Sequence, residues 1–148
     1  MIKTLTLNPA VDETIIVKDF KTNSINRVKK TFKDAGGKGI NVAKMINNLG
    51  GNTIATGFLG GYNGKFIKKE MDEMGIDHDF TKVKKETRTN IKMVDQINKT
   101  FTDINEEGAF VTKKEILKLK ESIFSNLNPG DILTLSGSIP PGVSNNIY

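Results

Sequence analysis

A short glycine-rich segment carries the residue types best suited to binding a small polar molecule. Gly36, Gly37 and Gly39 surround Lys38, Asn41 follows, and an apolar pattern typical of a helix begins at once. Glycines let a backbone approach a ligand closely, and a helix N-terminus presents free N–H groups and partial positive charge. Lys38 adds a full charge, and Asn41 adds a donor and an acceptor. The segment indicates a site for a small anionic molecule, and an ordinary strand-to-helix turn is the equally open alternative.

The spacing of these glycines excludes two common nucleotide-binding motifs. A dinucleotide fingerprint requires a third glycine where Val42 stands. A P-loop requires a glycine five residues before Gly64 and a hydroxyl residue after Lys65, but Leu59 and Phe66 occupy those places. The segment is therefore neither of these motifs.

Two further polar residues follow predicted strands. Asp12 comes after the Asn-Pro turn that ends the strand Ile2–Leu7, near the carboxyl edge where open α/β sheets bind ligands. A carboxylate there accepts sugar hydroxyls, although a solvated turn aspartate is the plainer alternative. Ser138 lies in a turn after the strand Ile132–Leu135, where its hydroxyl and nearby backbone N–H groups suit a phosphate.

Three polar residues alternate along one predicted strand. Arg88, Asn90 and Lys92 are spaced by two, so their side chains share one face, while Ile91 and Met93 point the other way. Such alternation commonly marks the solvent side of an amphipathic strand. It also suits phosphate binding, because arginine offers paired donors and lysine a point charge.

The periodicity of apolar residues predicts a layered α/β fold with a mostly parallel sheet, because strands alternate with helices. The strands are predicted at Ile2–Leu7, Thr14–Val17, Val28–Phe32, Thr53–Leu59, Thr89–Val94, Phe101–Ile104 and Ile132–Leu135. Three helices are predicted: one burying Val42, Met45, Ile46 and Leu49; one capped by Asn63 and burying Phe66, Ile67, Met71 and Met74; and one opened by a Thr112/Glu115 capping box and burying Ile116, Leu119, Ile123 and Leu127. A further helix is expected to begin at Ser144.

Composition narrows the class of protein. The 148 residues suffice for one domain, and 36% hydrophobic with 26% charged residues is ordinary for a soluble globular protein. No apolar run reaches the length of a membrane span. Neither cysteine nor a signal peptide is present, so we expect a cytoplasmic protein. The net charge of +5 comes without lysines interleaved by aromatics, which argues against nucleic acid. His78 has no nearby ligand-type partner, so no metal site is expected.

Three segments spread along the chain resemble the ribokinase-like (PfkB) family of carbohydrate kinases. They are Thr6–Asp12, Ala35–Gly61 and Leu135–Gly142. The resemblance implies a three-layer sandwich with a small β-sheet lid, built from about 13–33 and 86–105, over the sugar site. It implies that Asp12, Gly37, Lys38 and Asn41 hold a sugar, and that Arg88, Arg27 and Ser138 bind its phosphate, with ATP and Mg²⁺ as the phosphoryl donor.

Within that family, the chain is most similar to the phosphosugar branch. The segments Glu86–Lys92 and Thr102–Glu106 resemble 1-phosphofructokinase, which implies phosphorylation of fructose 1-phosphate to fructose 1,6-bisphosphate. Tagatose 6-phosphate is the alternative acceptor, because the sugar-binding residues do not separate the two. The segment Glu106–Ala109 departs from the pattern of 1-phosphofructokinase, in which a proline and a Gly-Pro pair are expected there.

One motif of this family is missing from the sequence. A Gly-x-Gly-Asp loop carries the catalytic aspartate of the family and most of its ATP site, and no such loop occurs here. We therefore expect that aspartate beyond residue 148, the chain to be the N-terminal portion of a longer kinase, and residues 1–148 to be inactive alone. A noncatalytic sugar-phosphate-binding module is the remaining alternative. An edge strand of the lid could pair with a second copy and form a homodimer.

Overall fold

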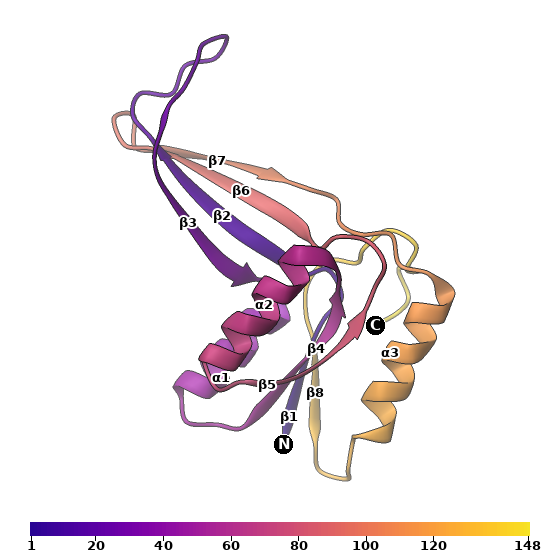
Figure 1. Ribbon diagram of the computed structural model, residues 1–148. Coiled ribbons are helices and arrows are strands. Elements are labelled where there is room, and N and C mark those ends of the chain that lie inside the picture. Colours follow the sequence, from indigo (N-terminus) through magenta and orange to yellow (C-terminus); the bar gives the residue numbers. More distant parts are fainter.

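Two four-stranded sheets and three helices make up the computed structural model, which describes residues 1–148 (Figure 1). The first sheet has the order β5-β4-β1-β8, all parallel, and the second has the order β3-β2-β6-β7. The strands of the first sheet are β1 (Ile2–Thr6), β4 (Thr53–Leu59), β5 (Asp77–Lys82) and β8 (Ile132–Leu135), and those of the second are β2 (Ala10–Val17), β3 (Val28–Gly36), β6 (Arg88–Asp95) and β7 (Thr100–Asn105). The α/β class with a parallel sheet is thus confirmed.

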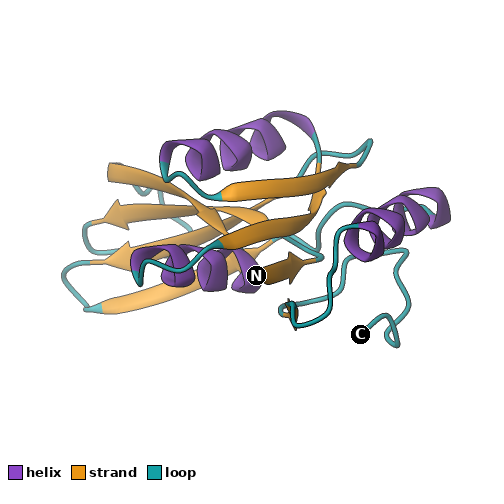
Figure 2. Ribbon diagram, turned by 90° about the horizontal axis from the view of Figure 1, so that it is seen from below, coloured by secondary structure: helices purple, strands orange, loops and turns teal.

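The helices cover the two faces of the first sheet. Helices α1 (Lys38–Asn48) and α2 (Gly61–Glu73) share one apolar cluster with β4, whereas α3 (Lys113–Ser125) packs in a second cluster with β1. Figure 2 shows one helix, with the C-terminal residues beside it, set apart from the other two. Each face of the sheet is buried by its own helices, as expected for parallel strands.

The second sheet extends away from the first and from the helices (Figure 1). Strands β2 and β6, far apart in sequence, pair in parallel, and β3 and β7 flank them antiparallel. The register places Asp12 opposite Asn90 on one side and Asp34 on the other. The chain enters this sheet directly from β1 and leaves it directly into α1, so the base of the second sheet lies at the carboxyl edge of the first.

The strands of the second sheet differ in length from the prediction. β2 begins at Ala10 rather than Thr14, and β3 continues to Gly36 rather than ending at Phe32. Pairing between strands extends both elements through polar residues that carry no apolar signal. β5 was missed altogether, because Phe80 is its only buried residue and the strand lies at the edge of the first sheet.

Helix α1 buries a different stripe from the one predicted. Ile40 and Ala43 are fully buried, whereas Met45 and Leu49 are 58% and 79% exposed. The reason lies in Gly39, whose missing side chain leaves room for the Leu5 carbonyl and the Thr6 hydroxyl of β1. This close approach fixes the rotation of α1 by its first turn rather than by its larger apolar residues.

The helix ends follow the prediction only in part. The capping box of α3 is confirmed, since Thr112 and Glu115 bond each other's backbone N–H groups. Asn63 does not cap α2; the Glu86 carboxylate accepts from the Tyr62 and Asn63 N–H groups instead. No helix forms from Ser144, where the chain makes turns. None of the three helices is long and apolar enough to cross a lipid bilayer.

Candidate functional site

One face of the second sheet is hollowed where it faces away from the helices. The cavity has a volume of about 380 Å³. All four strands of this sheet contribute to its lining: Asp12, Thr14, Phe32, Asp34, Asn90, Ile91, Lys92, Asp103 and Asn105. Seven of these nine residues are polar, so the hollow offers hydrogen-bond acceptors and donors to a hydroxylated molecule.

The Asp12 carboxylate is held at the base of this hollow. Its Oδ1 accepts from Asn90 Nδ2 at 3.0 Å, across the β2–β6 pair. The carboxylate occupies the space in which a side chain at Gly36 would stand. Any larger residue at position 36 would therefore displace it. Asn90 Oδ1 is buried and has no partner, so the pair retains an unused acceptor beside the Asp12 carboxylate.

Asp12 reaches this position differently from the prediction. It is the third residue of β2 and lies in a paired strand, not in a turn beyond β1. The parallel pairing with β6 is responsible, because it begins at Ala10 opposite Arg88 and continues through Asp12. The residue nevertheless stands near the carboxyl end of β1, as the sequence indicated.

Helix α1 begins two residues after Gly36. Gly37 precedes its first residue with φ of 125°, in the region that favours glycine, and no side chain caps the helix. Lys38 and Asn41 lie one turn apart on the exposed surface of its first turn. Neither lines the hollow, so the structure places them at the adjoining helix N-terminus. Lys44 ties α1 to β3 through Asp34 Oδ1 at 2.6 Å and the Ala35 carbonyl at 2.7 Å.

Arg88 lies at the base of the second sheet rather than in the hollow. Its guanidinium donates to the carbonyls of Glu106 at 2.9 Å and Asn8 at 3.1 Å. Burial lowers its pKa from the ordinary arginine value, and Asp12 and Glu106 oppose that shift. Its Nε–H is buried without a partner. Arg88 therefore joins β6 to the β1–β2 turn and keeps one donor free.

Asn8 connects Arg88 with Ser138, a role that sequence reasoning missed. Its Nδ2 donates to the Glu107 carbonyl at 3.0 Å and to Ser138 Oγ at 3.3 Å, while its own carbonyl accepts from Arg88. The Asn-Pro pair indicated only the end of a strand. Asn8 is only 6% exposed, and nothing in the sequence indicates that this residue is buried.

The other two cations lie nearer than Arg88 to the far end of the second sheet. Lys92 lines the hollow, 4.0 Å from Asp103 Oδ1 and 5.4 Å from the centre of the Phe101 ring. Arg27 directly precedes β3, whose first residue pairs with Val17 at the far end of β2. The structure therefore does not bring Arg27 together with Asp12 or Arg88.

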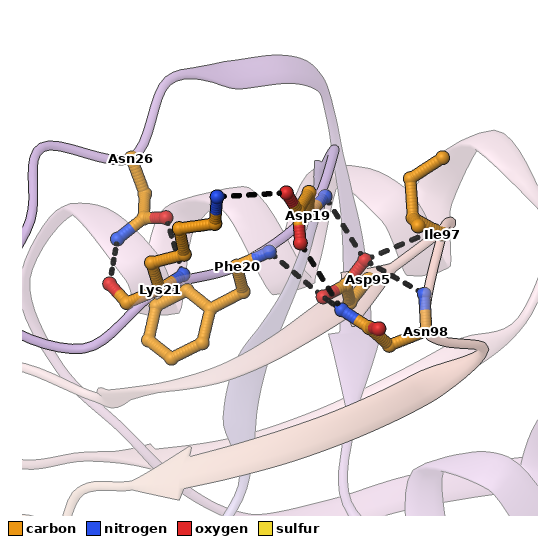
Figure 3. Close-up of polar contacts among 7 residues, drawn as sticks. All are labelled: Asp19, Phe20, Lys21, Asn26, Asp95, Ile97 and Asn98. Atoms are coloured by element: carbon orange, nitrogen blue, oxygen red, sulfur yellow. Dashed lines mark hydrogen bonds and ion pairs between the residues drawn. The ribbon is translucent and has the colours of Figure 1, made fainter.

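At that far end, Asp95 joins the segment between β2 and β3 to the turn between β6 and β7. It accepts from Asn98 Nδ2 at 2.8 Å and from the backbone N–H groups of Asp19, Phe20, Ile97 and Asn98 (Figure 3). The bond from the Asn98 side chain contributes most to a pKa of the Asp95 carboxyl well below its usual range. The segment that carries Arg27 is thus attached to the β6–β7 turn.

The hollow suits a polyhydroxylated molecule better than a free anion. Three carboxylates, Asp12, Asp34 and Asp103, line it with one cation, Lys92, and Asp34 is also paired with Lys44 of α1. Carboxylates accept from hydroxyls but repel anions. Cationic donors lie instead at the edges, in Arg88 and Lys38. Nowhere do three or more His, Cys, Asp or Glu side chains gather as metal ligands, so these residues do not by themselves form a Mg²⁺ site.

Comparison with known proteins places this geometry among sugar kinases. A family model described as pfkB family carbohydrate kinase matches residues 5–148. The whole chain is 42% identical to a 1-phosphofructokinase of Borreliella burgdorferi and 37% identical to a tagatose-6-phosphate kinase of Staphylococcus epidermidis, and covers 47% of each. The phosphofructokinase-2 of Escherichia coli, solved with fructose-6-phosphate, superimposes with a TM-score of 0.91 at 30% identity, covering 97% of this chain and 47% of that one. The chain thus spans about half the length of the relatives it matches.

Proposed function

Since the chain belongs to the pfkB family of carbohydrate kinases, we propose that it forms the sugar-phosphate site of a kinase that phosphorylates fructose 1-phosphate to fructose 1,6-bisphosphate. The observation that carries this proposal is the Asp12 carboxylate. It is seated over Gly36, oriented by Asn90, and set at the base of an acceptor-rich hollow. The 1-phosphofructokinase relative supports the choice of acceptor.

In this proposal, the sugar hydroxyls donate to the Asp12 carboxylate. Gly36 leaves room for that carboxylate, and Gly37, Lys38 and Asn41 are proposed to contact the sugar from the start of α1. Phosphoryl transfer depends on positioning and charge neutralisation more than on covalent steps. Holding the acceptor ring by two or more hydroxyls fixes which remaining hydroxyl faces the phosphoryl donor.

The phosphate already on the sugar is proposed to lie against Arg88 and Ser138, while Asn90 and Lys92 of β6 are proposed to contact the rest of the substrate. Arg88 Nε–H is a buried donor without a partner, and an anion would satisfy it. Asn8 holds both Arg88 and Ser138, so it positions the two proposed phosphate contacts. Arg27 stays a proposed phosphate contact that this structure does not bring near the others.

The second sheet is proposed to act as the lid of this site, corresponding to the segments 13–33 and 86–105. Its hollowed face carries Asp12 and Asn90, so a bound sugar would lie against it. Its outer strands, β3 and β7, are edge strands. Either edge could pair with a second copy and form the proposed homodimer.

ATP bound with Mg²⁺ would supply the phosphoryl group, as is proposed from the family. No group of three or more ligand-type side chains is placed to hold the metal by itself, and Mg²⁺ is usually bound by one or two carboxylates together with the phosphates of its nucleotide. We therefore assign to this chain only the binding and orientation of the acceptor. The catalytic aspartate is proposed to lie outside residues 1–148.

The proposal is tested by the kcat/KM of the full-length protein for fructose 1-phosphate, tagatose 6-phosphate, fructose 6-phosphate and fructose. Fructose 1-phosphate should be preferred, and free fructose should be poor because the buried Arg88 would lack its anion. A preference for tagatose 6-phosphate, the second candidate that the S. epidermidis relative favours, would change the acceptor. A preference for free fructose would overturn the phosphate site.

A companion measurement concerns residues 1–148 alone. We expect no turnover of fructose 1-phosphate with MgATP, because general-base help alone is worth roughly 10²–10⁴-fold. An ADP-release assay on residues 1–148, run beside the intact protein, checks this. Turnover within tenfold of the intact protein would show that the catalytic groups lie within these residues.

A further inference from the structure

A second hollow, lined by lysines, lies at the carboxyl ends of β4 and β5. It has a volume of about 670 Å³, and Lys65, Lys68, Lys82 and Lys84 line it together with Gly60 and Gly61. None of its residues lines the hollow around Asp12. We name it the lysine groove, after these four lysines. The lysine groove lies at the carboxyl edge of a parallel sheet, and open α/β sheets bind their ligands at that edge.

The charge of the lysine groove is strongly one-sided. Glu86 is the only acidic residue in its lining. Both Glu86 oxygens are engaged, accepting from the Tyr62 N–H at 3.1 Å and the Asn63 N–H at 2.7 Å. None of the four lysines has a carboxylate oxygen within 4.0 Å, unlike Lys69 on the same helix, which pairs with Glu73 at 3.4 Å. The groove therefore concentrates positive charge that the protein itself does not neutralise.

The backbone around the groove is fixed rather than loose. Val83 N–H donates to the Leu59 carbonyl at 2.9 Å, and Lys84 N–H donates to Glu115 Oε1 at 3.0 Å. Gly60 N–H donates to Thr87 Oγ1 at 2.9 Å. A side chain at Gly60 would overlap the carbonyls of Val83 and Lys85, so the two walls approach closely only because position 60 is glycine. The backbone that carries the lysines is therefore held by hydrogen bonds in the absence of a ligand.

We propose that the lysine groove binds a small molecule that carries two or more adjacent phosphoryl groups. Four like charges around one cavity repel one another, and an anion of matching multiplicity among them would replace that repulsion by attraction. A volume of this order accommodates a nucleotide-sized ligand. The exposed Tyr62 ring, with Lys65 Nζ 5.5 Å from its centre, provides an aromatic surface beside the cations.

The groove favours a small polyphosphate over a nucleic acid strand. A strand needs a basic path that continues along the surface with several stacking aromatics. Here the lysines converge on one cavity, and Tyr62 is the only aromatic residue in its lining. The ligand is therefore a compact multivalent anion.

Tripolyphosphate without Mg²⁺ is the probe for a calorimetric titration of the full-length protein. Lys65→Gln and Lys82→Gln should each weaken binding about fivefold, because one charge pair near 4 Å is worth about that factor in water. Glu86→Gln keeps an acceptor for the α2 N–H groups but removes the negative charge, so it should tighten binding by a similar factor. Lys69→Gln removes an equal charge from the same helix outside the groove and should leave affinity unchanged.

The lysine variants should weaken binding and Glu86→Gln should tighten it. These opposite effects distinguish the lysine groove from any other anion site. Unchanged affinity in both lysine variants, or an equal loss in Lys69→Gln, overturns the proposal. Weaker binding by Glu86→Gln, with an unchanged melting temperature, also overturns it. A single-stranded oligonucleotide that binds more tightly than tripolyphosphate, with the same dependence on Lys65 and Lys82, would replace the small ligand by nucleic acid.

Discussion

Replacing Gly36 by alanine should impair sugar-phosphate binding through Asp12 alone. The added methyl group would stand where the Asp12 carboxylate now lies. The φ angle of Gly36 is outside the left-handed region, so alanine adds no backbone strain. The Asp12 side chain is only half-buried and can rotate away from the methyl group. The folded state should therefore survive, with the carboxylate out of position.

The magnitude follows from the hydrogen bonds that Asp12 would lose. The bond from Asn90 Nδ2 at 3.0 Å would break, and the proposed bonds from sugar hydroxyls would be lost with it. Hydrogen bonds to a charged group contribute about 1.5–3 kcal/mol. Counting the loss of one such bond to the sugar, the dissociation constant for fructose 1-phosphate should rise at least about 10- to 150-fold. Titration calorimetry on the full-length protein measures this directly.

A double-mutant cycle shows whether the effect passes through Asp12. Asp12→Ala alone should weaken binding at least as much as Gly36→Ala. In the Asp12→Ala background, Gly36→Ala should add almost nothing, because the displaced group is already absent. Additive losses would refute the reasoning, since Gly36 would then act on the sugar or the backbone independently of Asp12. Melting temperatures of all four proteins serve as the control for folding.

Three further predictions concern Arg88 beside the site, Asp95 in the second sheet and Thr112 at the start of α3. Arg88→Ala should raise the KM for the sugar phosphate far more than the KM for ATP, and should also lower the melting temperature, because the carbonyls of Asn8 and Glu106 lose their donor; an unchanged KM would leave Arg88 a purely structural residue. Asp95→Asn should speed hydrogen exchange at the Phe20 and Ile97 amides. Because the folded pKa of Asp95 lies below its unfolded value, this protection should be complete above about pH 5 and decline as the pH falls below about 4; protection that is flat down to pH 2 would contradict the role of the carboxylate. Thr112→Ala should destabilise the protein by about 1 kcal/mol in denaturant unfolding while Thr112→Ser does not, since only the hydroxyl completes the capping box; equal unfolding curves for all three proteins would show that the cap contributes nothing.

The sequence predicted those elements in which local pattern and tertiary packing agree. α3, with its capping box and inward Leu119 and Ile123, is an example. It mispredicted the face of α1, because the approach of Gly39 to β1 decides that face and leaves no periodic signal. It missed β5 because an edge strand with one buried residue lacks an apolar pattern.

The candidate site, like the fold, was predicted from the sequence only in part. Gly36, Asp12 and Asn90 could be singled out as residues able to bind a ligand. Their proximity depends on the pairing of β2 with β3 and with β6, and Asp12 and Asn90 are 78 positions apart in the sequence. The bond from Asn8 to Ser138 Oγ joins residues 130 positions apart. The other bond of the Asn8 side chain and the two bonds of the Arg88 guanidinium have backbone carbonyls as acceptors. Such bonds are independent of residue type at the acceptor, so no sequence motif records them.

The location of the sugar phosphate in a crystal structure of the full-length protein with fructose 1-phosphate tests the central claim most directly. We predict sugar hydroxyls within hydrogen-bond distance of the Asp12 carboxylate, and the phosphate beside Arg88 Nε and Ser138. The Asp12–Asn90 bond should persist at its length of 3.0 Å. A sugar phosphate bound elsewhere, with the Asp12 carboxylate facing only solvent, would contradict the assignment of this hollow as the acceptor site.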